Sequence, residues 1–399
     1  MKTTRRAFAF LLFLLAALAP PISAQTAKRP AATKQYVVYV GTYTTKTASK
    51  GIYAFRYDAS SGKLTPVGVA AETPDPSWVA IHPSGKFLYA VNEAGKNSMV
   101  TAFSLDAQSG KLMLLNQLPA LGEDPCYLSF DRTGKYAFVA NYTSGNVVVF
   151  PIGRGGKLGA ATANVRDEGS LGPNKERQDG PHAHWIGTSG DALFVADLGL
   201  DRVLVYRFFP ANGTLRPAPA PDTKHPFVRH ALELSPGTGP RHVAFSTAGN
   251  GHGLTYVLGE LDSSVTLFVT TREGTYSGLA GQKVATLPPG FSGRNDAAEI
   301  EVHPSGRFLY ASNRGHDSIA VYSIDRDSGK LTQVADVHTS GKEPRHFAID
   351  PSGNFLLAED QLSDKIVTFR IDQKTGALTP TGDSVEVPSP VCLAFLPLD

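Results

Sequence analysis

The sequence predicts an all-β protein, a seven-bladed β-propeller with four-stranded antiparallel blades. Three observations support this fold class. A phrase recurs about every 50 residues, which is the period of propeller blades rather than of helical repeats. Each copy holds short runs of Val, Ile, Tyr, Phe and Thr that alternate with polar residues and end at glycine-containing turns, as β-strands do. No window shows a helical period.

Residues 1–24 are typical of a secretory signal peptide. Three basic residues precede an apolar run from Ala7 to Leu18, and the small-residue sequence PISA follows. The run is shorter than the roughly 20 apolar residues of a membrane-spanning helix, and no later segment approaches that length. We therefore expect cleavage after Ala24, a periplasmic or secreted protein, and no membrane association after cleavage. The sequence TRRAF also resembles a twin-arginine export signal.

In the remaining chain, residues 25–35 are expected to be a flexible segment and residues 36–399 the propeller. The composition of the chain excludes several classes of partner and site. A net charge of +2 over 399 residues, without a basic block, gives no electrostatic footprint for nucleic acid. Cys126 and Cys392 are the only cysteines, so neither a disulfide framework nor a thiolate metal site can form. Both should be free, because they lie on different inner strands. We further expect a monomer.

The clearest copies of the repeat are HPSGKFLYAVNEAGKNSMVTAFSLDAQSGKL near residue 82 and HPSGRFLYASNRGHDSIAVYSIDRDSGKL near residue 303. Weaker copies lie between and around them, which makes seven. One large apolar residue is equivalent in every copy, and we expect it to pack between blades. These equivalent residues are Tyr39, Tyr89, Phe138, Phe194, Tyr256, Tyr310 and Leu357.

Each copy predicts four strands, named A to D here. Strand A precedes the HPSG turn, strand B is KFLYAVN or its equivalent, strand C is SMVTAFSLD or its equivalent, and strand D follows SGKL. The array opens on a strand B and ends on a strand A, SPVCLAFLPLD. The N-terminal strands should therefore pair with the C-terminal strand in one blade, closing the ring and removing two sheet edges.

This layout predicts where a functional site lies. In a four-stranded meander, the start of strand A and the turn from B to C lie on the same face of the disc. Strand A is the innermost strand in propellers of this kind. Residues that open strands A should therefore surround one mouth of the central channel, with the residues of the B to C turns around them.

The strands A begin PSWVAI, PCYLSF, PHAHWI, PRHVAF, AAEIEV, PRHFAI and PVCLAF. Aligned on their prolines, they have an apolar third position in six blades and His184 in the remaining one. This alignment predicts that His184 is a polar exception at an apolar position. The first two positions contribute His182, Arg241, Arg345, His242, Glu299 and His346.

The B to C turns add further polar residues to the same face. They are Asn92, Glu93, Asn141, Asp197, Glu260, Asn313, Arg314, His316 and Gln361. Buried charges must be paired or must meet a ligand, because desolvation costs several kcal/mol per ion. The cluster could join neighbouring blades through ion pairs, but its crowding on one face favours a ligand site. We expect substrate contacts from Asn141, Asp197, His242, Glu299, Asn313, His316, Arg345, His346 and Gln361.

Other kinds of chemistry have weaker support. His182 and His184 alternate along a strand and could share a face, but no carboxylate or third histidine stands at metal-site spacing in that segment. We therefore expect no metal ion and no other cofactor. The chain has no recognisable GxSxG sequence or Ser–His–Asp order, and Cys126 has no identifiable activating neighbour. Nucleophilic catalysis is not expected.

The phrases ERQDGPHAH, VADLGLDRV, GTGPRHVAF, GELDSSV, AAEIEVHPSGRFLYASNRGHDSIAVY and EPRHFAIDPSGNFLLAEDQ together resemble the bacterial 6-phosphogluconolactonase family of seven-bladed propellers. The fungal carboxy-cis,cis-muconate lactonising enzymes are relatives of that family. The resemblance covers nearly all of the mature chain and implies ester chemistry on a lactone ring without a metal. It places a catalytic histidine at His182 or His184, site arginines at Arg241 and Arg314, and a site carboxylate at Glu260.

These observations predict an exported lactonase that opens a sugar-type lactone, similar to 6-phosphogluconolactone, by attack of water. Arg241 or Arg314 would stabilise the oxyanion, and Arg345 would hold a carboxylate or phosphate of the substrate. His184 or His182 is the expected base, with Glu260 orienting it or acting in its place. The alternatives are a non-catalytic propeller that binds a small acidic ligand or a protein partner, and a lactone-forming cycloisomerase of the muconate type.

Overall fold

The computed structural model describes residues 35–189, 192–218, 231–247, 249, 251–270 and 276–398. The expected signal peptide and residues 25–34 of the expected flexible segment lie outside these residues. Gln35, assigned to that segment, is the first residue of a strand. Across the described residues, no helix has the length and apolarity needed to cross a membrane. The only helices found there are two single turns, η1 (Gly95–Asn97) and η2 (Gln361–Ser363).

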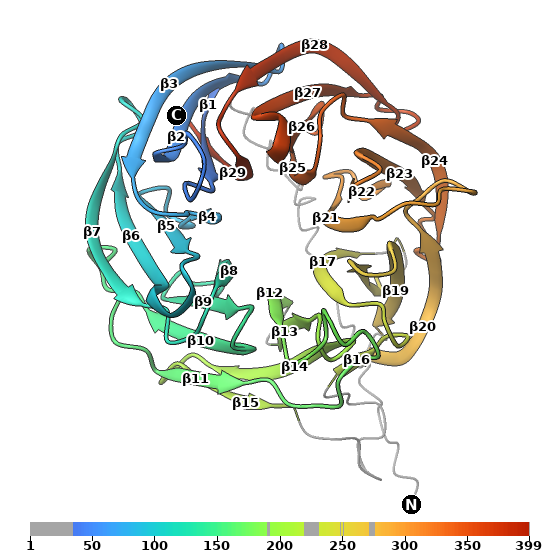
Figure 1. Ribbon diagram of the computed structural model, residues 1–399, viewed down its shortest axis with the longest axis horizontal. Helices are drawn as coiled ribbons and strands as arrows, with labels where there is room; N and C mark the ends of the chain where they lie inside the picture. Colours follow the sequence, from blue (N-terminus) through green and yellow to red (C-terminus); the bar gives the residue numbers. More distant parts are fainter. Residues whose placement is uncertain are drawn as a thin grey trace, which may run out of the picture. The chain divides into compact units, whose positions relative to one another are not determined.

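Seven antiparallel sheets form a ring around a central channel, which confirms the predicted architecture (Figure 1). Blade 1 contains β4 (Trp78–Ile81), β5 (Phe87–Asn92), β6 (Met99–Leu105) and β7 (Leu112–Pro119). Blade 2 contains β8 (Pro125–Phe130), β9 (Tyr136–Asn141), β10 (Asn146–Pro151) and β11 (Ala163–Arg166). Blade 3 contains β12 (Ala183–Ser189), β13 (Ala192–Asp197), β14 (Arg202–Phe209), β15 (Thr214–Pro217) and a fifth strand, β16 (Ala231–Glu233).

The other four blades repeat the arrangement. Blade 4 contains β17 (Pro240–Thr247), β18 (Gly253–Gly259), β19 (Ser264–Thr270) and β20 (Tyr276–Ala285). Blade 5 contains β21 (Asp296–Val302), β22 (Phe308–Arg314), β23 (Ser318–Ile324) and β24 (Leu331–His338). Blade 6 contains β25 (Pro344–Ile349), β26 (Phe355–Asp360), β27 (Lys365–Ile371) and β28 (Leu378–Glu386). Blade 7 contains β29 (Pro390–Pro397), β1 (Gln35–Thr42), β2 (Gly51–Asp58) and β3 (Lys63–Glu72).

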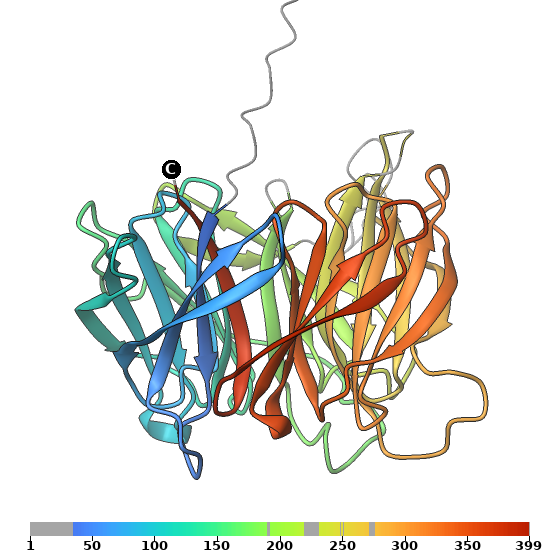
Figure 2. The same cartoon turned by 90° about the horizontal axis from the view of Figure 1, so that it is seen from above.

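The two ends of the propeller meet in blade 7. β1 pairs with β29 in antiparallel register from Tyr36 opposite Pro397 to Thr42 opposite Pro390. The C-terminal strand thus supplies the inner strand of the blade that the N-terminal strands begin, as predicted. The innermost strands in Figure 1 are β4, β8, β12, β17, β21, β25 and β29. Figure 2 shows the disc edge-on, with the long loops before β12 and β21 extending from one face.

The predicted large apolar residues of strands B are completely buried, and three of the tyrosines among them bond to the next blade. The hydroxyl groups of Tyr89, Tyr256 and Tyr310 donate to glycine carbonyl oxygens at 2.7–2.8 Å. Each glycine lies in the C to D turn of the following blade and has a positive φ, between 73° and 79°. The repeated SGKL turn therefore supplies both the left-handed conformation and the space that the neighbouring blade needs.

Strand A begins with a β-bulge at the channel mouth in six of the blades, and the bulge overturns one prediction. In blades 2, 4 and 6 the extra residues between paired neighbours are Cys126, Arg241 and Arg345. In blade 3 the extra residue is His184, between Ala183 and Trp185. His184 is therefore equivalent to Arg241 and is not a polar exception in the apolar third position, which Ile186 fills completely buried. Ala183 takes the place of the prolines in the other blades, so aligning Pro181 with them shifted this strand by two residues.

Candidate active site

A cavity of about 270 Å³ lies at the channel mouth where strands A begin. The bulges supply part of its lining, because a bulge turns the side chain of the extra residue away from the regular alternation. The residues that follow strands B supply most of the rest. The lining residues are Tyr43, Glu93, Cys126, Tyr142, Arg177, His184, Arg241, Glu260, Arg314 and Arg345. The structure therefore brings together five of the predicted site residues, His184, Arg241, Glu260, Arg314 and Arg345.

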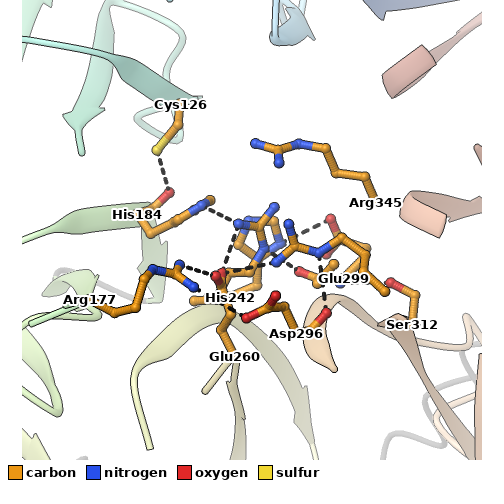
Figure 3. A network of polar contacts seen from close by, with 12 residues as sticks. Cys126, Arg177, His184, His242, Glu260, Asp296, Glu299, Ser312 and Arg345 are labelled. Carbon is orange, nitrogen blue, oxygen red and sulfur yellow. Dashed lines mark hydrogen bonds and ion pairs between the residues drawn. The ribbon is translucent and has the colours of Figure 1, made fainter. Parts of the chain in front are cut away.

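Glu260 is the centre of the charge network in this pocket (Figure 3). Its carboxylate lies 3.0 Å from the guanidinium of Arg241 and 3.3 Å from that of Arg314, and it also pairs with Arg177. Burial alone would raise the pKa of Glu260, but Arg314 and Arg241 outweigh it and hold that pKa well below its usual range. Glu260 is therefore ionised at neutral pH and fixes the guanidinium groups around it.

Arg241 connects this carboxylate to the histidine of the pocket. Its Nε donates to the carbonyl oxygen of Ala298 at 2.9 Å, and one terminal nitrogen contacts both Glu260 and Nε2 of His184. A guanidinium has no acceptor, so Nε2 of His184 must accept and the imidazole proton resides on Nδ1. Burial and the charge of Arg241 lower the pKa of His184 well below its usual value. The pocket therefore holds a neutral histidine.

Arg345 lies on a different wall from the Glu260 network, and no dashed line reaches it in Figure 3. Its guanidinium donates to the hydroxyl of Tyr43 at 2.9 Å and lies 5.3 Å from the centre of that ring. The hydroxyl of Tyr43 in turn donates to Glu93 at 2.8 Å. Within the described ranges Arg345 forms no direct ion pair with a carboxylate, which leaves guanidinium donors for a ligand.

Arg177 was not predicted as a site residue. It lies in the loop between β11 and β12, and it reaches over the mouth to Glu260 and, at 3.2 Å, to Asp296. Gln178 fixes this loop by donating to the carbonyl oxygen of Leu198 and to Asp201, both at 2.9 Å. The side chain of Arg177 is 34% exposed. The loop stands outside the repeat, so a repeat alignment offers no signal for it.

His182 lies outside the pocket lining. Its ring stacks on Tyr142 with centroids 4.6 Å apart, and its two ring nitrogens contact the carbonyl oxygen of Tyr142 at 3.0 Å and Asp179 at 2.9 Å. Tyr142 itself lines the pocket. The structure thus places His184, and not His182, in the pocket lining, and it gives His182 a position behind Tyr142.

His242, Glu299 and His346 lie next to the bulges but one layer deeper in the channel. Nδ1 of His242 contacts Glu299 at 3.0 Å, and Nε2 of His346 lies 3.4 Å from the same carboxylate. Nδ1 of His346 contacts Glu359 at 2.6 Å. None of the three lines the pocket.

The remaining predicted substrate contacts have other partners. Asn141 is the last residue of β9 and Asn313 the last but one of β22, and they donate to the backbone carbonyl oxygens of Ala120 and Thr286. Asp197 accepts from the backbone nitrogens of His182 and Leu200 at 2.9 and 3.0 Å. His316 packs on Phe291 and His338, and Gln361 begins η2. None of these predicted residues lines the pocket: Asn141, Asp197, Asn313, His316 and Gln361.

Both cysteines are free and buried, as predicted. Cys126 lines the pocket, with its sulfur 3.4 Å from the carbonyl oxygen of His184, and burial raises the pKa of its thiol. A raised pKa disfavours the nucleophilic thiolate. Within the part of the chain that the structure describes, no group of three or more His, Cys, Asp or Glu residues is placed to hold a metal ion.

Known proteins share this architecture over most of the chain. Residues 37–395 match the sequence profile of a family described as lactonase, 7-bladed beta-propeller. The chain is 36% identical over 365 residues to the 6-phosphogluconolactonase of Bacillus subtilis, covering 91% of this chain and 99% of that protein. It is 33% identical over 323 residues to the 6-phosphogluconolactonase of Formosa agariphila, covering 78% and 86%. The solved structure of a periplasmic gluconolactonase of Pseudomonas aeruginosa matches with a TM-score of 0.81 and 33% identity, covering 91% and 99%.

Proposed function

Because this chain belongs to the lactonase family of seven-bladed β-propellers, whose members are carboxylic ester hydrolases, we propose that it opens a sugar-type lactone carrying an anionic group. A lactone similar to 6-phosphogluconolactone meets this description. The observation that carries the proposal is the charge of the pocket. Four arginines and two glutamates line it, an excess of two positive charges around a neutral histidine. Such a pocket suits an anionic substrate and an anionic transition state.

The arginines fixed by Glu260 are placed to stabilise the oxyanion. When water adds to a lactone carbonyl, negative charge develops on the carbonyl oxygen. Arg314 is held by Glu260 and by the carbonyl oxygen of Asp296 at 3.2 Å, so its donors are already in position. Arg241 is held through Nε by the carbonyl oxygen of Ala298 at 2.9 Å, and only its terminal nitrogen has to move from His184 to the oxyanion. Preorganised donors of this kind each contribute about 3 kcal/mol to the transition state. In this proposal the guanidinium groups supply the positive charge, and no metal ion has a role.

His184 is the proposed base. As the guanidinium of Arg241 turns to the developing oxyanion, it leaves Nε2 of His184 free to accept a proton from the attacking water. The tetrahedral intermediate then collapses, the ring C–O bond breaks, and the ring oxygen takes up the proton from His184 to become the hydroxyl of the product. Glu260 stays ionised and orients Arg241. Arg345 holds the phosphate or carboxylate of the substrate through its planar donors.

We further propose that the protein is exported and acts in the periplasm or outside the cell. The apolar run from Ala7 to Leu18 and the following small-residue site support this proposal, as does the name of the periplasmic gluconolactonase of Pseudomonas aeruginosa. Fractionation of the source cells and N-terminal sequencing of the purified protein test it. We expect a mature chain that begins at Gln25. An uncleaved protein in the cytosol would contradict it.

A rate screen tests the activity. The purified protein is mixed with aldonolactones, with their 6-phosphates and with carboxylated lactones, and acid release is corrected for spontaneous hydrolysis. We expect faster opening of an anionic lactone, a loss on the order of a hundredfold in Arg241→Gln, and no loss in the control Arg216→Gln, an exposed arginine of β15. Opening at the rate of buffer alone would contradict the proposal. Binding without opening would support the non-catalytic alternative, and ring formation from an unsaturated dicarboxylate would support the lactone-forming one.

A further inference from the structure

An aromatic layer separates the pocket from a second cavity in the same channel. The rings of Trp78 and Tyr127 stack with centroids 4.0 Å apart. The ring of His242 meets both at 5.8 and 5.4 Å, and the ring of His346 lies 5.2 Å from Trp78. Beyond this layer lies a cavity of about 360 Å³ that is lined in part by Glu299, His346 and the partly exposed Glu301.

A continuous row of ionisable side chains crosses this layer, and we name it the polar seam. It consists of His242, Glu299, His346 and Glu359. The steps between them are 3.0, 3.4 and 2.6 Å. All four are at most 5% exposed, so their charges are not screened by water. Glu301 lies two residues after Glu299 on β21 and accepts from the backbone nitrogen of Ile349 at 2.9 Å.

The polar seam begins next to the proposed base. The ring centroids of His184 and His242 are 5.2 Å apart. Nδ1 of His184 and Nε2 of His242 are both buried and have no hydrogen-bond partner among the described residues. A buried ring nitrogen without a hydrogen-bond partner lowers the stability of the fold, so two of them on adjacent histidines call for a functional explanation. A proton on Nδ1 of His184 therefore has a neighbouring acceptor on the side away from the pocket mouth.

The seam residues can exchange protons near neutral pH. Burial disfavours the charged form of His346, but Glu359 and Glu299 outweigh it and raise the pKa of His346 to about 9. Burial and the neighbouring Glu299 raise the pKa of Glu301 to about 8. Burial lowers the pKa of His242 despite Glu299, so this ring is neutral at rest and free to accept. His184, with Arg241 beside it, faces the seam from the pocket side.

Release of a proton through the pocket mouth is electrostatically unfavourable. Arg177, Arg241, Arg314 and Arg345 surround the mouth, and a positive charge that leaves between them is repelled. Hydrolysis at neutral pH must nevertheless release one proton per turnover, because a lactone and water become a hydroxyl group, a carboxylate and a proton. The carboxylates on the inner side of the aromatic layer attract that proton.

We propose that the polar seam carries the proton of each hydrolysis from His184 through His242 and Glu299 to His346, which lines the second cavity together with Glu301 and releases the proton there. Water gives one proton to His184, which passes it to the ring oxygen as the C–O bond breaks. The carboxylic acid so formed gives the second proton of the water to His184, and this proton leaves along the seam. No oxidant, metal or second substrate enters the balance. His242 and Glu301 are positioning residues in this account, because they contact neither the lactone nor the attacking water. The inference rests on the proposed lactonase activity.

The test uses His242→Phe, which keeps an aromatic ring against Trp78 and Tyr127, and Glu301→Gln, which keeps an acceptor for the backbone of Ile349. Initial rates on the best lactone are measured at constant ionic strength and pH while the concentration of a small buffer, imidazole, is raised. We expect kcat to fall on the order of a hundredfold at low buffer concentration, KM to stay unchanged, and imidazole to restore the rate. His303→Phe, a buried histidine bonded to Ser305 and Gly353 outside the channel, is the control.

The outcomes are separable. A wild-type protein that opens no lactone overturns the proposed function and this inference together. An active wild type with variants that keep its rate, or lose it without any dependence on imidazole, overturns the seam alone. If His303→Phe does not fold, His82→Phe takes its place, because His82 makes the equivalent contacts with Ser84 and Gly134.

Discussion

Arg241 donates a hydrogen bond to Nε2 of His184 from the equivalent bulge of the neighbouring blade. The two residues therefore form a pair in which the arginine carries the charge and the histidine stays neutral. Burial and this positive neighbour both act against protonation of the imidazole. In the proposed mechanism this pair provides an oxyanion donor and a base at one point of the channel mouth, and the following predictions test it.

His184→Gln should separate catalysis from stability. The glutamine oxygen can accept from Arg241, so the free energy of unfolding should change by less than about 1 kcal/mol. The rate should fall about a hundredfold to ten-thousandfold, because a general base is lost. Steady-state kinetics and urea unfolding check both. The control is His182→Phe, which keeps an aromatic ring on Tyr142, and a control that loses as much activity would show that His182 is the base.

The pH profile should be flat around neutrality. A histidine whose pKa is lowered remains neutral at and below its ordinary pKa of about 6.5, so kcat/KM should fall only at pH values well below that. Glu260 is ionised throughout, because its pKa is also lowered. The profile of kcat/KM on the best lactone, corrected for spontaneous opening, checks this. A decline centred near pH 6.5 would mean that His184 lacks the influence of Arg241.

Glu260→Gln should destabilise the fold as well as abolish activity. The neutral amide leaves the buried guanidinium of Arg241 and its neighbour Arg314 without a counter-charge, at a cost of about 3 kcal/mol or more. The folded pKa of Glu260 is lowered, so its stabilisation is present above the unfolded pKa and is lost as pH falls through the folded one. Urea unfolding at pH 7 and at lower pH measures the effect, with the exposed Glu72→Gln as control. Equal stability of both variants at pH 7 would contradict the network.

The contacts between blades should depend on single glycines. Gly156 has φ +79°, and a Cβ atom there would overlap the ring of Phe87 in the preceding blade. Gly156→Ala should therefore destabilise the fold by more than about 1 kcal/mol. The adjacent Gly155→Ala is a matched control, because nothing lies within 4 Å of its Cβ position. Thermal unfolding of the two variants measures the difference, and equal melting temperatures would argue against the role of the repeat glycine.

The fold could be predicted because its determinants are local and repeated. The sequence itself shows the apolar–polar alternation of each strand, the glycine turns and the incomplete repeats at the two ends of the array. Ring closure by β1 and β29 follows from those incomplete repeats. The position of His184 could not be predicted in the same way. A bulge adds one residue without changing the composition, so Pro181 and Ala183 cannot be told apart as the start of the paired strand.

Of the predicted site residues, the structure gathers the three arginines, Glu260 and His184 into one pocket and places the others outside it. Arg241 and Glu260 are charged and buried at one mouth, with the partly buried Arg314 beside them, so their charges had to be paired there. Asn141 and Asn313 are short amides that bond to nearby backbone, which is how strands B end in this fold. Tyr43 and Tyr142 directly follow strands B, at the repeat position of Glu93 and Glu260, and were missed because the prediction was built on charged and amide side chains. Arg177 was missed because it lies in a loop outside the repeat.

The most direct measurement of the central claim compares two lactones that differ in one phosphate. Initial rates of acid release from 6-phosphogluconolactone and from gluconolactone are measured for the wild type and for Arg345→Met. We predict that the wild type opens the phosphorylated lactone well above the spontaneous rate. We also predict that the variant raises KM for that lactone about tenfold to a hundredfold, because a charge-assisted pair is lost, while KM for gluconolactone stays the same. Opening of neither lactone above the rate in buffer, or an equal effect of Arg345→Met on both, would contradict an anion-binding lactonase pocket at this channel mouth.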